Sequence, residues 1–320
     1  MSTVFDSLIV PQPVQDLLNF QLSQKSAFVG SGAAGFESLT SLGGNFYMRF
    51  RADEDTGHGV VITGTAVSPS AIGTSPDIAP VLRRVRARKA VDGMNAALGL
   101  LSMSPTEAIL RQTATWWAAE FDAVFASILA GLFDGSSGVL RTTHRRSVAT
   151  ASPTTPVPIS YGQIVQAASL AGDTVFDLAA IVMHSKCWAD LCLEAGAKIS
   201  FETLGGTPIP RVNGMRVIVS DACPTSSTGA NTIYTSYLLR PGALYIATQQ
   251  GLTEFAAPDP LVPGYNLSQS WHFAAGAVGT KWVPSTTNLE NDDLETPASW
   301  AKSATDKCIG VIALQTNSNI

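Results

Sequence analysis

Charged residues are scarce in this chain of 320 amino acids, at 14% of the sequence, where about 25% is usual for a soluble domain. The scarcity implies either that much of the surface is buried against partners or that neutral polar residues keep the chain soluble. The net charge of −5 argues against a protein whose main task is to grip nucleic-acid phosphates, because that task favours a basic chain. Local basic patches are compatible with this balance.

Cysteine and histidine are also few, with four of each. The cysteines, at positions 187, 192, 223 and 308, form no C-x-x-C pair, so we expect reduced, buried thiols in a cytosolic protein. The sequence has no H-E-x-x-H motif, no paired histidines at ligand spacing and no calcium loop, so it predicts no metal and no cofactor. His184 and Cys187 could form a nucleophilic pair, but His184 and Ser185 are better explained as helix caps. We therefore predict no catalytic residues and no enzyme.

The sequence shows neither a signal peptide nor a clear membrane span. The first ten residues contain Asp6 and lack a basic region. The most apolar stretch, 116–133, is interrupted by Glu120 and Asp122, which makes it a poor span. Apolar residues make up 45% of the chain, enough for a substantial core. The length suits two subdomains or one large irregular domain.

One stretch matches a dinucleotide-binding fingerprint. Residues 30–35 read GSGAAG, which is G-x-G-x-x-G, and acidic residues follow at 53–55. The fingerprint requires a strand before its first glycine and a helix at its last. The apolar run before Gly30 is too short for a central strand, and Gly43-Gly44 breaks a following helix. An NAD-dependent enzyme is therefore a remote alternative, and we interpret the stretch as part of a flexible, Gly-rich arm.

Residues 46–90 predict a long, exposed β-hairpin. Strands are expected at 45–51 and 60–65, a Ser/Pro/Gly-rich tip at 68–80, and a returning strand at 81–90, which reads VLRRVRARKA. On that strand Arg84, Arg86 and Arg88 share one face, while Val85 and Ala87 take the other.

The basic run of this hairpin is the one charged cluster to which we assign a role. We expect it to meet carboxylates of a neighbouring subunit, with a solvated strand face and a nucleic-acid contact as the alternatives. Replacing Arg84, Arg86 and Arg88 by Glu should then leave the subunit folded but block assembly. The predicted contact residues are Arg83, Arg84, Arg86, Arg88 and Lys89.

A long helix is predicted at 104–133. Ser104-Pro105-Thr106-Glu107 reads as a capping box with proline at the first helical position. Apolar residues from Leu110 to Leu132 then recur on one stripe, and Asp134-Gly135 ends the helix. At 1.5 Å per residue its length is about 45 Å, which is too long for the interior of a compact domain.

The remainder predicts an α+β protein, because strands and helices do not alternate as in a doubly wound sheet. We expect helices at 161–171, 184–195 and 289–295, and strands at 176–183, 215–219, 232–239, 243–247, 271–282 and 309–314.

The order of these elements resembles that of the major capsid proteins of tailed bacteriophages, which have the Hong Kong 97-type fold. Each motif alone is loose, but the motifs stand in the family's order along nearly the whole chain. They are the long helix from SPTEAI through Trp117 to Phe133, AAIVMHSKCWADL at 179–191, RVNGMRVIVSDACP at 211–224, YTSYLLRPGALYIA at 234–247, HFAAGAVGTKW at 272–282, and the closing segment 285–317.

The resemblance implies a division of the chain into named parts. These are an N-terminal arm (1–45), an E-loop hairpin (46–95), a peripheral domain (96–160) holding the spine helix (104–133), an axial domain (161–240), strands returning to the peripheral domain (241–284), and a C-terminal segment (285–320) that rejoins the axial domain. Some relatives crosslink subunits through a Lys–Asn bond. We predict no crosslink, because Lys89 is the only lysine in the hairpin region and does not lie at its tip.

The resemblance also implies a function. The chain would assemble with itself into hexamers and pentamers of an icosahedral shell around double-stranded DNA, which it contacts non-specifically. Portal and scaffold proteins, and a decoration protein in some cases, would be partners, with no membrane. The protein would belong to the virion capsid and assemble in the host cytoplasm. The alternative is an encapsulin, a compartment shell of the same fold that encloses cargo protein.

Overall fold

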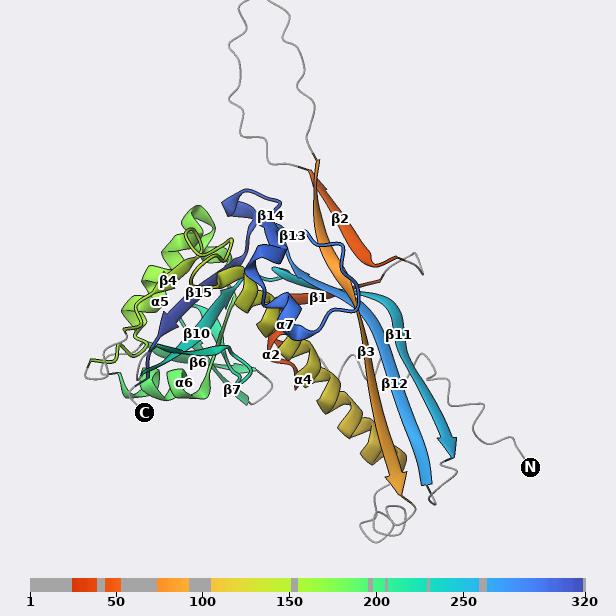
Figure 1. Cartoon of the computed structure of the whole chain (residues 1–320). Helices are drawn as coiled ribbons and strands as arrows, with labels where there is room; N and C mark the ends of the chain where they lie inside the picture. The colour runs from red at the N-terminus through yellow and green to blue at the C-terminus, as the bar shows by residue number, and fades with distance from the viewer. Residues whose placement is uncertain are drawn as a thin grey trace, which may run out of the picture.

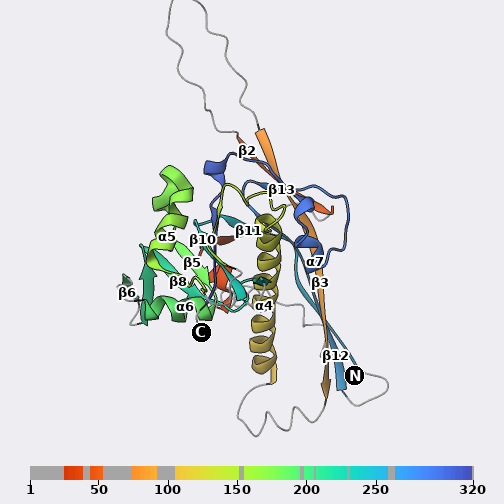
Figure 2. The same cartoon turned by 60° about the vertical axis from the view of Figure 1, so that its left-hand side comes forward.

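Two β-sheets flank one long helix in the computed structural model (Figures 1 and 2). The structure describes residues 25–38, 44–52, 74–91, 105–150, 155–194, 198–204, 207–228, 231–258 and 264–318. The strands of the first sheet, which we call the peripheral sheet, run in the order β1-β11-β12-β3-β13-β14, with β2 paired to β3. The second, the axial sheet, has the order β4-β15-β10-β5-β8-β7-β6, with β9 paired to β10.

The peripheral sheet is built around β3, which changes its main partner along its length. Residues 74–80 pair with β2 and residues 81–91 pair with β12. The predicted hairpin tip at 68–80 is therefore wrong for residues 74–80, which are strand. Residues 53–73, with the predicted strand at 60–65, lie outside the described residues. The strands are β1 (Ala34–Ser38), β2 (Phe46–Ala52), β3 (Thr74–Val91), β11 (Leu244–Pro258), β12 (Gly264–Ala277), β13 (Thr280–Trp282) and β14 (Trp300–Lys302).

The axial sheet contains the last strand, β15 (Val311–Thr316), between β4 and β10. The C-terminal segment thus adds a strand to the sheet that also holds β5, β8 and β10. β4, which lies in the range 96–160 expected for the peripheral domain, pairs with β15, and the domain bounds stay a prediction. The other strands are β4 (Arg145–Ser147), β5 (Ala180–Met183), β6 (Ile199–Leu204), β7 (Thr207–Val212), β8 (Met215–Val219), β9 (Thr225–Thr228) and β10 (Asn231–Leu239).

Short helices complete the two units. His184 caps α6 by accepting a hydrogen bond from the backbone N–H of Lys186 (3.2 Å), which confirms its predicted role. The axial unit carries α5 (Tyr161–Ala168), the 3-10 helix η1 (Ser169–Asp177) and α6 (Ser185–Leu193). The remaining helices are α2 (Ala27–Gly30), α7 (Asn291–Leu294), η2 (Pro297–Ser299) and η3 (Asp306–Cys308).

The long helix α4 spans Pro105–Phe133, close to its predicted bounds. It ends where the Asp134 carboxylate accepts hydrogen bonds from the backbone N–H groups of Ser136 and Ser137. Its second half lies between the two sheets: Phe121 packs on Phe273 of β12, and Phe133 on Tyr237 of β10. The stretch 112–133 is apolar enough to cross a membrane by composition alone, but 72% of it is buried inside the protein, as in a core helix. The second half of α4 is thus a core helix, which the sequence analysis did not predict.

Candidate assembly surfaces

Strand β2 has one polar face whose partners come from the same chain. The Tyr47 hydroxyl donates to Glu37 (2.7 Å), and Arg49 lies 3.5 Å from the same carboxylate. Arg51 lies 3.7 Å from Asp77, which is buried. Burial and the Glu37 carboxylate raise the pKa of Tyr47 to about 12, so its hydroxyl stays a donor at neutral pH. This face of the hairpin is thus satisfied without a neighbour.

The opposite face of β2 is apolar and open. Met48 is 53% exposed and Phe50 71% exposed. Their cross-strand partners are Ile78 and Pro76, so all four side chains share one side of the two-stranded base. We call this set the apolar hairpin face. A contiguous exposed apolar patch marks an interaction surface, and no described residue of the chain covers it.

The predicted basic strand does not lie in the projecting hairpin. Residues 81–91 pair with β12 in the peripheral sheet, beside α4. Arg84 Nε lies 3.2 Å from Glu120 of α4, and its guanidinium donates to the carbonyl of Leu289 (3.1 Å). Arg86 is 7% exposed, with its guanidinium 4.9 Å from the centre of the Trp116 ring. These two arginines are bound within their own chain.

The predicted alternation of arginine and apolar side chains along this strand is confirmed. The face that points inward is the arginine face, however, and not the apolar face. Val85 is 63% exposed and Ala87 is exposed, while the arginine face lies against α4. Contrary to the sequence analysis, we therefore expect reversal of Arg84 and Arg86 to Glu to damage the fold, because Arg84 pairs with Glu120 and Arg86 lies on the Trp116 ring.

The other predicted contact residues, Arg83, Arg88 and Lys89, are not shown to be buried against α4. Arg83 is exposed and donates to the side chain of Asn45 (2.9 Å). The backbone of Arg88 and Lys89 pairs with Leu267 and Asn266 of β12, and their side chains lie outside the described residues. A contact of Arg83, Arg88 and Lys89 with a neighbouring subunit stays a prediction.

A second exposed apolar set lies on the axial unit. Phe176 of η1 is 95% exposed, Leu193 at the end of α6 is 74% exposed, and Phe201 of β6 is 65% exposed. Strands β6 and β2 lie at opposite sides of the molecule (Figure 1). Phe201 and the apolar hairpin face therefore belong to strands on opposite sides of the molecule. A head-to-tail contact between identical subunits joins two different surfaces of this kind. Sequence reasoning missed both sets, because neither shows a distinctive pattern.

The GSGAAG stretch has the reverse of the dinucleotide-binding order. It follows α2, turns at Gly32 with φ +76°, and enters β1, so helix precedes strand. The interpretation as a flexible arm is also wrong for this part, because Ala33 and Ala34 are buried. The stretch therefore does not have the strand–loop–helix geometry by which the fingerprint binds a dinucleotide.

The alternative of a nucleophilic pair of His184 and Cys187, which the sequence analysis set aside, finds no support in the geometry. The Cys187 thiol faces Thr316 (3.8 Å), and burial raises its pKa to about 11. His184 packs instead on the ring of Tyr234 and lies 3.5 Å from Asp221. All four cysteines are free, but Cys192 is exposed, contrary to expectation.

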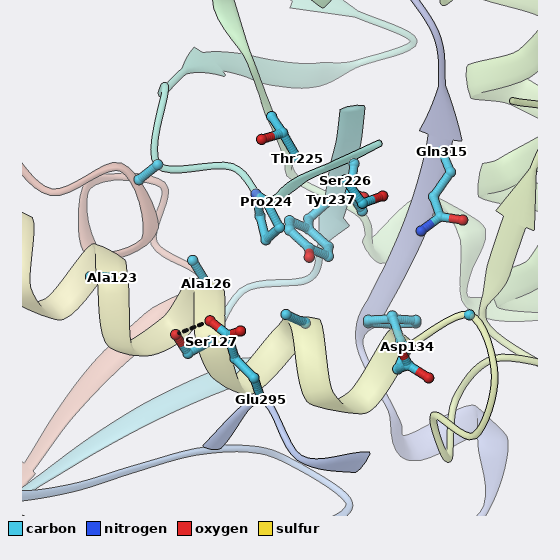
Figure 3. Close-up of a pocket in the computed structure, with 15 residues that line it drawn as sticks. Ala123, Ala126, Ser127, Asp134, Pro224, Thr225, Ser226, Tyr237, Glu295 and Gln315 are labelled. Atoms are coloured by element: carbon cyan, nitrogen blue, oxygen red, sulfur yellow. Dashed lines mark hydrogen bonds between the residues drawn. The ribbon is translucent and has the colours of Figure 1, made fainter. Parts of the chain in front are cut away.

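A hollow of about 470 Å³ lies between α4 and strands β9 and β10 (Figure 3). Ala123, Ala126 and Ala130 leave space on the helix side, and Ser127 donates to Glu295 (2.9 Å) at its edge. Its lining contains neither histidine nor cysteine. Within the described ranges, no group of three metal-binding side chains occurs here or elsewhere. The hollow therefore offers no recognisable catalytic arrangement.

Comparison with known proteins identifies the family and the fold. The model of the Gp13-like family, described as "Major capsid protein 13-like", matches residues 118–311. The major capsid protein of Bacillus phage SPP1 is 26% identical over 97% of both chains. The capsid protein of Ralstonia phage GP4 superposes with a TM-score of 0.57 at 13% identity, covering 92% of each chain. An encapsulin of Synechococcus elongatus gives a TM-score of 0.50 at 12% identity, over 87% of this chain and 83% of the encapsulin. The predicted fold is thus confirmed, and the chain belongs to the Gp13-like family of major capsid proteins.

Proposed function

We propose that this major capsid protein associates into hexamers and pentamers that close into an icosahedral shell around double-stranded DNA. The observation that carries the proposal is the exposed apolar hairpin face at Met48 and Phe50, together with the exposed apolar side chains of Phe176, Leu193 and Phe201 on the axial unit. Each needs a cover that the described part of the chain does not supply. Repeated head-to-tail contacts of this kind close into rings.

The apolar hairpin face is the surface that we assign to neighbour contact. Its strand is already held by the ion pairs and hydrogen bonds of Arg49, Arg51 and Tyr47 on the other side. The hairpin base is therefore ordered before association, which lowers the conformational entropy lost on binding. Many such modest contacts sum to a stable shell.

The finer partners belong to the same proposal. A portal, a scaffold and in some cases a decoration protein would join the shell, and assembly would take place in the host cytoplasm. The match to the SPP1 protein over 97% of both chains supports a shell that holds DNA. An encapsulin function, with protein cargo, is the second candidate because the same fold serves both.

Sedimentation and negative-stain electron microscopy of the expressed chain test this function. We raise the protein concentration and add a crowding agent, so that assembly is not limited by a missing scaffold. Closed shells or rings of five and six subunits are expected, and a monomer under all these conditions would contradict the proposal. For particles purified from infected or expressing cells, nuclease-resistant DNA supports the viral function. A single enriched cargo protein supports the encapsulin function instead.

A further inference from the structure

The segment Ser26–Ser38 contacts three parts of the molecule that are far apart in sequence. Its first contact is with α4. The carboxylate of Asp122 accepts hydrogen bonds from the Ser26 hydroxyl (2.6 Å) and from the backbone N–H groups of Ala27 (2.9 Å) and Phe28 (3.3 Å). These three donors stand at the N-terminal end of α2, where a negative charge is favoured.

The second contact is with the axial sheet. The Phe28 ring, fully buried, lies 5.8 Å from the ring of Phe125 on α4 and 6.3 Å from that of Tyr237 on β10. The guanidinium of Arg216, on β8, donates to the carbonyl of Gly30 (3.2 Å). Phe28 therefore acts as a wedge between α4 and the axial sheet.

The third contact is with the peripheral sheet, at the point where the chain crosses from one sheet to the other. The backbone N–H of Gly242 donates to Gly32 (3.1 Å), and that of Leu244 donates to Ala33 (2.8 Å). Strand β1 then pairs in parallel with residues 244–248 of β11. Since Gly242 stands between β10 and β11, the segment spans the junction of the two sheets.

Helix α2 does not hold this position by its own stability. It has only four residues, and an isolated helix of that length is unstable in water. Asp122 is 7% exposed, and burial raises the pKa of its carboxyl, so its charge is tolerated through the three hydrogen bonds it accepts. The seat of the segment thus depends on Asp122 and Phe28.

We propose that Ser26–Ser38 is a clasp that fixes the orientation of the axial sheet relative to α4 and the peripheral sheet, and that Asp122 is the positioning residue that seats it. The inference rests on the proposed function, because the angle between the two units sets the curvature that neighbouring subunits form. Loss of the clasp should leave both sheets folded but let their relative orientation vary.

Amide hydrogen exchange on the full chain tests the seat of the clasp. Asp122→Asn removes the carboxylate and places an NH₂ group among the donors. Exchange at residues 27–30 and 34–38 should rise about tenfold, with the centre of β12 unchanged. Glu120→Gln is the matched control, since it removes one charge from the same helix and weakens the ion pair with Arg84. It should lower the stability of the subunit but leave exchange at residues 27–30 and 34–38 unchanged relative to β12. If Asp122→Asn does not fold, Ser26→Ala removes one donor and should give a smaller rise. Unchanged exchange in the variant that folds would overturn the proposal.

The shape of the assembled particles tests whether the clasp sets the orientation of the two sheets, because a residue that only stabilises the subunit would not change particle diameter. Asp122→Asn subunits should associate but form shells of broader diameter, or open and irregular ones, while Glu120→Gln shells keep the wild-type distribution. Shells of normal diameter from a variant with a released clasp would overturn the assigned role. If the wild-type chain makes no shells, the proposed function fails, whereas the exchange result still decides whether Asp122 seats the clasp.

Discussion

Polar and apolar side chains alternate along both halves of β3, but the two halves pack against different parts of the chain. In residues 81–91 the polar residues Arg84 and Arg86 lie against α4, and Val85 faces outward. In residues 74–80, Asp77 is buried beside Arg51, and the apolar face with Ile78 continues onto the exposed Met48 and Phe50. In both halves charged side chains, Arg84, Arg86 and Asp77 among them, find partners within the chain, while apolar side chains are exposed.

The difference between the halves lies in what surrounds them. The lower half, 81–91, has α4 and the segment around Leu289 packed against it, so its side chains stabilise the subunit. The upper half, 74–80, pairs with β2 on one edge and with β13 at Ile78 on the other, while Met48 and Phe50 beside it stay exposed. Charge alone is therefore a poor guide to an assembly surface in this protein. The buried Arg86 stabilises the subunit, whereas the exposed Phe50 is available for contact with a neighbouring subunit.

Reversing a charge in the lower half should cause the largest loss of subunit stability. Arg84→Glu places a carboxylate beside Glu120, where Arg84 is 16% exposed. We expect the free energy of unfolding to fall by about 3 kcal/mol, because a largely buried charge loses its partner. Arg83→Glu, one residue away on the exposed face, should change it by less than about 0.5 kcal/mol. Equal losses in urea unfolding would contradict the inward direction of the arginine face.

The next largest effect should come from the contact that holds the Leu289–Trp300 segment on α4. A Cβ at Gly131 would lie 2.4 Å from the carbonyl oxygen of Leu294, which accepts the Trp300 indole hydrogen bond. Gly131→Ala should therefore cost about 2 kcal/mol by overpacking. Gly162→Ala on α5 meets no atom within 4 Å and should be neutral or stabilising. Thermal unfolding compares the two, and a neutral Gly131→Ala would show that this segment is loosely packed.

The smallest effect on stability, but a large one on assembly, should come from the upper half. Phe50→Ser removes an apolar side chain that is 71% exposed, so the free energy of unfolding should change by less than about 0.5 kcal/mol. The yield of shells should nevertheless collapse. Val85→Ser, with a side chain 63% exposed on the lower half, is the matched control and should assemble normally. Equal yields of shells from the two variants would show that the apolar side chains of the upper half matter no more for assembly than those of the lower half.

Much of the fold could be predicted from sequence because the signals were local. The capping box and apolar stripe located α4 to within a residue, and β8 was predicted at its observed bounds. Alternation in VLRRVRARKA showed which side chains share a face. It could not show which face is inside, because Trp116 and Glu120 arrive from α4, some thirty residues further along the chain. The clasp was missed for the same reason, since Asp122 lies 96 residues from Ser26.

The assembly surfaces were harder still to predict. Phe50 and Phe176 resemble core residues in the sequence, and only the structure shows that they are exposed. The second half of β11 and the first half of β12, residues 249–258 and 264–270, were not predicted, because they contain many Gln, Ser and Gly residues. These residues form strands through pairing with one another, which no short window of sequence reveals.

Oxidative footprinting of Met48 tests the central claim most directly, namely that the apolar hairpin face is covered by a neighbouring subunit. Met48 is 53% exposed in the subunit, whereas Met215 is 1% exposed and serves as the internal reference. Mass spectrometry follows sulfoxide formation at both residues in free subunits and in purified shells. The account predicts that Met48 oxidises several-fold more slowly in shells while Met215 stays slow in both. Equal oxidation of Met48 in subunits and shells would contradict it.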